Sequence, residues 1–312
     1  MIVYRGIPSK AAFASVLTIG NFDGVHLGHR AMLQRLVTIA RKAAMPAAVL
    51  TFEPHPREYF TPAEAPSRLT RLREKLELLA ECGVDHVYVC RFNAAFASLS
   101  ADDFIEKILV RGLGVRHLLI GDDFRFGKGR SGDFALLQKA GIAHRFAVEA
   151  MTTIELDGER VSSSSIRAAL ASGNLIRAEH FLGRRFSISG RIMHGDKIGR
   201  TLGFPTANVQ HARHRLPLTG VYAVSVDGLG EAPVFGAASV GVRPTIAAGL
   251  KPVLEVHLLN FQGDIYGAHV HVNFHHKLRD EAKYASLDAL KAQIARDVEA
   301  TRNYFQESTE SK

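Results

Sequence analysis

The chain has 312 residues, of which 46% are hydrophobic and 22% charged, with a formal net charge of +8 and a pI near 9.6. This length suits two domains, and no low-complexity tract points to a disordered or fibrous protein. The basic excess favours anionic ligands in general. Nucleic acid, nucleotides and phosphorylated metabolites would all fit this charge. However, Lys and Arg are spread along the chain without the block expected of a nucleic-acid arm.

The two cysteines, Cys82 and Cys90, lie in no metal-ligand spacing. We expect them to be small buried residues in a reducing compartment. No apolar stretch approaches the roughly 20 residues of a membrane span. The apolar run 11–19 leads directly into a glycine-rich loop with no cleavage site, so it indicates a strand rather than a signal peptide. The sequence therefore predicts a cytoplasmic protein without a membrane partner.

The first half of the chain alternates strand-like and helix-like segments. Strands are predicted at 16–19, 47–52, 86–89 and 115–120. Helices are predicted over 32–40, from about 70 to Gly83, and from an N-cap at Ser100 to about Gly112. Such alternation predicts an α/β fold with a parallel sheet covered on both faces. Ligands bind beyond the carboxyl ends of the strands in such sheets.

After about residue 184 the pattern changes to short strand-like runs at 186–192, 221–226, 234–240, 253–259 and 268–274, separated by Gly and Pro. This pattern predicts an antiparallel barrel or sandwich. A last helix is expected to begin at a Ser286 cap, because apolar residues then recur at helical spacing. The sequence thus predicts two domains, residues 1–183 and 184–312.

The string Gly20-Asn21-Phe22-Asp23-Gly24-Val25-His26-Leu27-Gly28-His29 joins the first of these strands to the first helix. Its glycines permit tight turns, and a helix start offers unpaired amides to phosphate oxygens. Two imidazoles three residues apart can face one side of the turn and donate hydrogen bonds to a phosphoryl group. The alternative is that one histidine is only a packed or capping residue.

This string resembles the His-x-Gly-His signature of the nucleotidyltransferase superfamily. With the preceding Gly-Asn-Phe-Asp-Gly, it resembles the adenylyltransferase half of bifunctional bacterial riboflavin kinase/FAD synthetases. The resemblance implies a Rossmann-like domain in which His26 and His29 stabilise the α-phosphate of ATP while FMN attacks and pyrophosphate leaves. It implies an ATP-binding loop made of Gly20, Phe22, Asp23, Gly24 and Gly28.

Two later strings resemble further motifs of this adenylyltransferase. In Gly121-Asp122-Asp123-Phe124-Arg125-Phe126-Gly127, the resemblance places Asp123 in the nucleotide site, where many relatives have Asn. Residues 161–167 resemble the family's Ser-Ser-x-x-Ile-Arg motif, and the resemblance implies that Ser163, Ser164 and Arg167 bind the triphosphate. Hydroxyls at a helix start can also be simple caps.

The flavin side of the same site is implied by Phe52-Glu53-Pro54-His55-Pro56, which resembles the family's Phe-x-Pro-His-Pro segment. The residues implied to bind flavin here are Phe52, Pro54, His55, Pro56 and Phe124. Phe124 and Phe126 could equally be core residues.

The string from Gly195 to Asn208 is too rich in glycine for the interior of a strand. Gly195, Gly199 and Gly203 can leave backbone amides free for phosphate. The Thr206 hydroxyl and the Asn208 carbonyl are oxygen ligands of the kind that Mg²⁺ prefers. The alternative is a long hairpin with a rigid proline turn.

This string resembles the Pro-Thr-Ala-Asn motif of riboflavin kinases, which implies a Greek-key β-barrel with a terminal helix and a site for ATP and Mg²⁺. The implied metal ligands are Thr206 and Asn208. The implied ATP-binding residues are Gly195, Lys197, Gly199, Gly203, Pro205, Thr206, Asn208 and Tyr222. Relatives usually carry Asn at Ser239 and Phe at Ile246, so the chain departs from the pattern beside the site.

Glu255 and His257 share one face of a predicted strand, because side chains alternate along it. A carboxylate there could accept a proton from a substrate hydroxyl, or it could be an ordinary exposed acid. The resemblance makes Glu255 the catalytic acid position of the kinase. It also implies that Arg279 and Glu281, within 278–284, bind the flavin.

The resemblance implies that the C-terminal domain uses MgATP to convert riboflavin to FMN and ADP. The N-terminal domain would then use a second ATP to convert FMN to FAD and pyrophosphate. A nucleic-acid-binding module is disfavoured, because no aromatic and basic stripe follows a strand. A cytidylyltransferase or aminoacyl-tRNA synthetase would not explain Pro-Thr-Ala-Asn, and a chain with only one activity is disfavoured because every proposed catalytic position is filled. The oligomeric state is left open.

Overall fold

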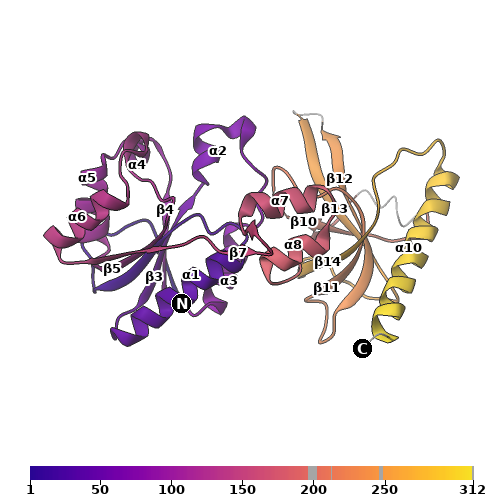
Figure 1. Cartoon of the computed structure of the whole chain (residues 1–312). Helices are drawn as coiled ribbons and strands as arrows, with labels where there is room; N and C mark the ends of the chain where they lie inside the picture. Colours follow the sequence, from indigo (N-terminus) through magenta and orange to yellow (C-terminus); the bar gives the residue numbers. More distant parts are fainter. Residues whose placement is uncertain (196–201, 212, 246–248, 311–312) are drawn as a thin grey trace. The chain divides into compact units, whose positions relative to one another are not determined.

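The computed structural model describes residues 1–195, 202–211, 213–245 and 249–310 (Figure 1). The chain forms two compact units. The first consists of Met1–Pro66 and Thr70–Ser162, and the second of Ser67–Leu69 and Ser163–Lys312. The predicted boundary at Gly183 falls within the second of these units and stays a prediction.

The first unit is built on a six-stranded parallel sheet of order β1-β4-β3-β2-β5-β6. Its strands are β1 (Ile2–Arg5), β2 (Ser15–Ile19), β3 (Ala47–Glu53), β4 (His86–Arg91), β5 (Val115–Gly121) and β6 (Ala147–Met151). The four central strands confirm the predicted ones. The sequence did not predict β1 and β6, because these edge strands are mostly exposed or half-buried and show no continuous apolar run.

Helical segments cover the sheet. They are α1 (Leu27–Lys42), α2 (Pro56–Phe60), η1 (Pro62–Glu64), α3 (Leu72–Glu81), α4 (Ala94–Ala97), α5 (Ala101–Asp103), the π-helical segment η2 (Phe104–Gly112), η3 (Lys128–Arg130) and α6 (Phe134–His144). A small ribbon of β7 (Glu155–Leu156) and β8 (Glu159–Arg160) follows β6. The predicted cap is confirmed, because Ser100 Oγ accepts a hydrogen bond from the Asp103 amide at 3.0 Å.

Adjacent residues of the central strands enter different hydrophobic clusters, as the alternation of side chains requires. Val16 packs with Leu33 of α1 and Leu79 of α3 in one cluster. Leu17 packs with Leu137 of α6 in the other. The sheet is therefore buried on both faces, which explains why its central strands read as continuous apolar runs.

The second unit begins with the helices α7 (Ser163–Ala171) and α8 (Leu175–Leu182), which are followed by a closed antiparallel barrel of order β10-β13-β12-β11-β14-β9. Its strands are β9 (Ser187–Met193), β10 (Ala207–Gln210), β11 (Gly220–Asp227), β12 (Val234–Thr245), β13 (Gly249–Leu258) and β14 (His269–Arg279). The barrel confirms the predicted all-β half. The four-residue β10 was hidden in the glycine-rich string, because it is too short to show an alternating pattern.

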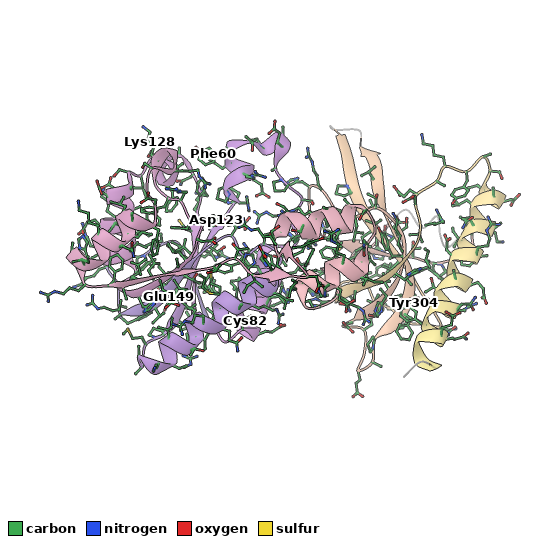
Figure 2. All side chains as sticks on the ribbon, in the orientation of Figure 1. Phe60, Cys82, Asp123, Lys128, Glu149 and Tyr304 are labelled. Atoms are coloured by element: carbon green, nitrogen blue, oxygen red, sulfur yellow. The ribbon has the colours of Figure 1, made fainter. Side chains whose placement is uncertain are left out.

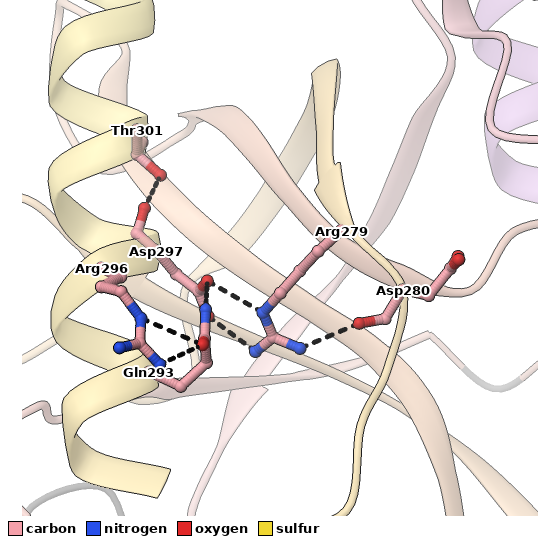
Figure 3. A network of polar contacts seen from close by, with 6 residues as sticks. All are labelled: Arg279, Asp280, Gln293, Arg296, Asp297 and Thr301. Carbon is pink, nitrogen blue, oxygen red and sulfur yellow. Dashed lines mark hydrogen bonds and ion pairs between the residues drawn. The ribbon is translucent and has the colours of Figure 1, made fainter. Parts of the chain in front are cut away.

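The final helix α10 (Leu287–Glu310) lies alongside the barrel and contacts β11, β12 and β14 (Figure 1). As predicted, Ser286 caps it, with Oγ accepting from the Ala289 amide at 3.2 Å. Arg279 of β14 makes two hydrogen bonds, of 2.9 and 2.7 Å, to the buried Asp297 carboxylate of this helix (Figure 3). A buried carboxylate requires such pairing, so this contact ties the helix to the barrel.

Candidate active sites

The loop between β2 and α1 has an unusual backbone. Phe22 and Val25 adopt positive φ angles of 48° and 40°, and Gly24 between them has φ 88°. A β-branched residue in this region is a genuine outlier. Such strain persists only where the surroundings enforce it, and it concentrates at functional sites.

Thr70, just before α3, is what anchors this loop. Asp23 Oδ1 accepts hydrogen bonds from the Thr70 amide at 2.9 Å and from its hydroxyl at 3.2 Å. The same hydroxyl accepts from the Gly24 amide at 2.9 Å. Asp23 is only 1% exposed, so its carboxylate acts as a loop anchor. No role for Thr70 beyond its place near a helix start was predicted from the sequence.

The two predicted histidines meet at the start of α1. His26 is the N-cap residue, and its Nδ1 accepts from the His29 amide at 3.4 Å. The imidazole rings stack with centroids 3.7 Å apart at 20°, and the Phe22 ring lies 5.1 Å from that of His29. His29 Nδ1 is buried and has no hydrogen-bond partner among the described residues. The motif thus presents two adjacent imidazoles at a helix N-terminus, where anions are favoured.

The pKa of His29 lies well below its ordinary value of 6.5. Burial of the ring is the main cause, followed by the charges of His26 and Lys75. His29 is therefore uncharged at neutral pH in the free protein. The sequence analysis did not single out Lys75 as a residue near the site. Its position among the apolar residues of α3, with Leu72, Leu76 and Leu79, could have indicated a buried charge.

The predicted flavin segment follows β3. His55 caps α2, with Nδ1 accepting from the Arg57 amide at 3.1 Å, and its own amide donates to Glu58 Oε2 at 3.0 Å. Pro56 occupies the first turn of α2, a position that suits proline. Pro54 precedes this cap. These contacts shape the segment, and its binding of flavin stays a prediction.

An aromatic cluster continues from Phe52. Its ring lies 5.8 Å from that of Phe92 and 5.5 Å from that of Phe96. Phe92 in turn contacts Tyr59 and Phe60. Phe60, labelled in Figure 2, is 62% exposed and is a large apolar surface that the sequence did not single out. Its position five residues after His55, on a short helix, could have marked it in the sequence as part of the same segment.

The second motif predicted for the nucleotide site follows β5. The Asp123 side chain, labelled in Figure 2, belongs to the first unit. It is 69% exposed and pairs with Arg160 at 2.8 Å. Phe124 stacks on the buried Phe126 with centroids 5.8 Å apart. Phe126 is thus a core residue, while the nucleotide and flavin contacts of Asp123 and Phe124 stay predictions.

The Ser-Ser-x-x-Ile-Arg motif forms the first turns of α7 and belongs to the second unit. Arg167 Nε donates to the Ser67 carbonyl at 2.7 Å, within the same unit. Because the histidines belong to the first unit, the joint ATP site of Ser163, Ser164 and Arg167 with those histidines stays a prediction.

On the barrel, Asn208 of β10 lies directly opposite Glu255 of β13. Glu255 in turn lies opposite Ser239 of β12. Directly paired side chains lie on one face, roughly 5 Å apart at Cβ. Their chain neighbours Ala207 and Val256 are buried on the other face. Strand register alone therefore brings the predicted amide and carboxylate together.

The turn before β10 is held by His257. Its Nδ1 lies 2.9 Å from the Pro205 carbonyl oxygen, which can only accept, so the imidazole donates. The Phe204 ring packs edge-on against the same imidazole at 5.5 Å. This arrangement positions Thr206 just before β10. No role for His257 was predicted from the sequence. A Cβ at Gly195 would overlap the Asn208 side-chain amide, so the glycine leaves room for this amide in the position that the structure gives it. Lys197 and Gly199 lie outside the described residues, and Gly203 has a left-handed φ of 87°.

The remaining kinase positions make structural contacts. Tyr222 is fully buried, donates to the Thr219 carbonyl at 2.7 Å, and has its pKa raised to about 12, mainly by burial. Arg279 binds Asp297 (Figure 3). The Glu281 carboxylate occupies the space beside Gly241. The ligand contacts predicted for Tyr222, Arg279 and Glu281 stay predictions.

Within the described part of the chain, no three His, Cys, Asp or Glu side chains cluster in a way that could hold a metal ion. The described helices include none with the length and apolar character needed to cross a membrane. Cys82 and Cys90 are both free thiols, and burial raises the pKa of Cys90 to about 12.

Similar proteins are known over nearly the full chain. A bifunctional riboflavin kinase/FMN adenylyltransferase of Escherichia coli (strain K12) is 56% identical over 93% of this chain and 92% of its own. One of Haemophilus influenzae is 50% identical over 98% and 99%. A crystal structure described as a macrolide-efflux protein from Streptococcus pneumoniae has a TM-score of 0.82 at 29% identity, covering 97% of this chain and 99% of that one.

Two family models also match, in an order that agrees with the two sites. The FAD synthetase model matches residues 9–165, and the riboflavin kinase model matches residues 182–305. The first match contains His26 and His29, and the second contains Asn208 and Glu255. The chain belongs to the bifunctional riboflavin kinase/FMN adenylyltransferase family.

Proposed function

We propose that the chain phosphorylates riboflavin to FMN on its barrel and adenylylates FMN to FAD on its parallel-sheet unit, with ATP as co-substrate in both steps. The stacked pair of His26 and His29 at the start of α1 is the observation that carries the second activity. The opposed pair of Asn208 and Glu255 supports the first. The two family matches supply the substrates.

In adenylyl transfer, a phosphate oxygen of FMN attacks the α-phosphorus of ATP, and the bond to the pyrophosphate oxygen breaks. Negative charge on the α-phosphate oxygens must then be stabilised. His26 and His29 would donate hydrogen bonds to these oxygens, assisted by the amides at the start of α1. We assign nucleotide contacts within this unit to Gly20, Phe22, Asp23, Gly24, Gly28 and Asp123. For Ser163, Ser164 and Arg167 of the second unit we propose binding of the ATP triphosphate, as their motif implies.

We place the FMN substrate of this step beside the aromatic cluster of Phe52. The implied flavin residues are Phe52, Pro54, His55, Pro56 and Phe124. A planar isoalloxazine stacks favourably on aromatic rings, and Phe60 offers an exposed one in the same cluster.

In the kinase step, the 5′-hydroxyl of riboflavin attacks the γ-phosphorus of ATP, and ADP leaves. Glu255 would orient this hydroxyl and accept its proton. The oxygen donors of Thr206 and Asn208 fit Mg²⁺, which prefers hard oxygen ligands and retains several waters. When bound, this ion would neutralise charge on the ATP phosphates. The turn held by His257 would position Thr206 for that role.

We further propose a division between the two activities near residue 183 and a cytoplasmic location. The first agrees with the start of the riboflavin kinase match at residue 182. The second agrees with the free thiols of Cys82 and Cys90, since thiols persist in reducing compartments.

A time course tests the proposal directly. The purified full chain is incubated with riboflavin, Mg²⁺ and ATP, and the flavins are separated by chromatography. FMN should appear before FAD. If FAD forms only from added FMN, the kinase assignment is wrong, and if neither flavin forms, both assignments are wrong.

A further inference from the structure

Lys75 is a fully buried cation beneath the loop of the adenylyl-transfer site. Its side chain is 0% exposed on α3, and its Nζ donates to Thr51 Oγ1 at 3.3 Å. Thr51 is also fully buried, and its hydroxyl donates a hydrogen bond to the Asn21 carbonyl oxygen at 3.3 Å. A continuous chain of donors therefore runs from the ammonium to the backbone of the loop.

The same region of the chain anchors the loop a second time. Thr70, five residues before Lys75, binds Asp23 and the Gly24 amide. Thr70 therefore holds Asp23 and Gly24. The hydrogen bonds from Lys75 through Thr51 form a relay that holds Asn21. These contacts surround Phe22, whose φ of 48° needs external support.

A buried ammonium also has an electrostatic effect. Burial of a charge is costly, so a lysine in an apolar stripe needs compensation that Met or Leu would not need. Its charge acts in a water-poor region, where Coulomb interactions are stronger than in water. It lies close enough to His29 to lower the pKa of that imidazole. A fixed positive charge behind a helix N-terminus also favours an approaching phosphate.

We propose that Lys75 is a positioning residue of the adenylyl-transfer site, which holds residues 20–24 through Thr51 and supplies a fixed positive charge behind His26 and His29. It acts on the α-phosphate through the loop and the imidazoles, without touching the nucleotide. This inference rests on the proposed role of the two histidines.

Three full-length variants separate the two parts of the proposal. Lys75→Met removes the charge and the relay at similar side-chain length. Thr51→Val removes only the relay, because the lysine remains. Lys139→Met, at an exposed position of α6, is the control for an equal change in net charge. The kinase step of each protein serves as an internal reference.

We expect Lys75→Met to lower the rate of FAD formation from FMN by about 10²-fold, since a misplacement of about 1 Å can have this effect. Thr51→Val should lower the rate of FAD formation by only about tenfold, because the positive charge of Lys75 remains. Lys139→Met should match the wild type. A wild-type rate in Lys75→Met would overturn the proposal, and a wild-type rate in Thr51→Val would overturn the holding of the loop.

A second measurement distinguishes a lysine that acts through its charge from one that only stabilises the structure. The charged and titratable groups that act on His29 are His26 and Lys75. In protein labelled at histidine, an NMR titration of the His29 ring should show a higher pKa in Lys75→Met and an unchanged pKa in Thr51→Val. An unchanged His29 pKa in Lys75→Met would overturn the charge effect. If His29→Ala itself retained full FAD formation, the underlying function would be wrong instead.

Discussion

The two proposed sites hold their functional side chains by different means. In the parallel-sheet unit, the loop 20–24 is held by side chains from elsewhere in the sequence, namely Thr70, Thr51 and Lys75. On the barrel, Asn208 and Glu255 are placed by strand register, which the backbone hydrogen bonds of β10, β12 and β13 fix. The first site depends on a few buried polar contacts, and the second depends on the ladder of the whole sheet.

This difference predicts how each site responds to substitution. A buried polar group that loses its partner costs more than the lost hydrogen bond alone, so the first site should be sensitive even away from the reacting atoms. A side chain on a strand can be replaced while the backbone hydrogen bonds between the strands stay intact. Substitutions at the second site should therefore lower its activity without disrupting the barrel.

The largest effect is expected for Glu255→Gln. The amide cannot accept the hydroxyl proton, and general-base catalysis typically contributes about 10²–10⁴-fold. FMN formation from riboflavin should fall by that factor, while FAD formation from supplied FMN stays at the wild-type rate. Chromatography of the flavins from separate reactions measures both steps.

The exposed Glu299→Gln on α10 is the matched control for Glu255→Gln. The thermal unfolding of the two variants should also agree, because register rather than the carboxylate holds the barrel. If Glu255→Gln lost both reactions equally, the assignment of separate sites would be wrong.

His29→Ala should produce the opposite pattern. Loss of one donor to the developing phosphate charge is typically worth about 10²–10³-fold in rate. FMN should therefore accumulate from riboflavin, with FAD appearing only slowly. The surface variant His144→Ala on α6 provides a control. A reduction of less than about threefold, far below that typical range, would contradict a direct role at the α-phosphate.

The distance between residues along the chain explains why the histidine pair could be predicted from the sequence. It also explains why the side chains that hold the loop beside this pair could not. His26 and His29 lie in one string beside a strand and a helix, so local pattern suffices. Thr70 reaches Asp23 across 47 positions, and Lys75 reaches Thr51 across 24. Such contacts depend on how β2, β3 and α3 pack, which local periodicity does not encode.

The fold shows the same limit. The buried strands β2 to β5 were predicted because each is a continuous apolar run. The edge strand β1 and the short β10 carry no such signal, since their formation depends on pairing with a neighbour. Asn208 could be chosen from its motif, but its position opposite Glu255 required the register of β10.

Thr70→Val tests the support of the first site away from its histidines. The valine keeps the shape but removes the hydroxyl that joins the Asp23 carboxylate to the Gly24 amide. An unsatisfied buried group typically costs about 1–3 kcal/mol, so the first unit should unfold at lower denaturant concentration. FAD formation should also fall by about tenfold, because the loop is misplaced.

The outcome for FMN formation decides how Thr70→Val is interpreted. The kinase rate should stay at the wild-type value, since the barrel has its own ladder. The substitution Thr38→Val, at an exposed threonine of α1, is the control for loss of a threonine hydroxyl and should leave FAD formation unchanged. Wild-type FAD formation in Thr70→Val would show that the loop does not depend on this anchor.

The smallest effect is expected for His275→Gln, on the pH dependence of the free energy of unfolding of the barrel. His275 of β14 lies 2.9 Å from Ser225 Oγ and packs against the Phe305 ring of α10. Its pKa is lowered from 6.5 to about 4, first by burial and then by the charge of Arg185, while Asp227 opposes the shift. The unfolded chain therefore binds a proton more readily than the folded one below pH 6.5.

The contribution of His275 is fully present above pH 6.5, falls as the pH drops from 6.5 to 4, and is absent below that range. Allowing for partial exposure of the ring, we expect a loss of about 2 kcal/mol. His275→Gln should flatten this part of the pH dependence, whereas the exposed His276→Gln should not. Urea unfolding at pH 7 and pH 5, followed by circular dichroism because the chain lacks tryptophan, measures the difference. An identical pH dependence in His275→Gln and the wild type would show that the uncharged His275, unlike the uncharged His29 of the adenylyl-transfer site, has no role in its part of the molecule.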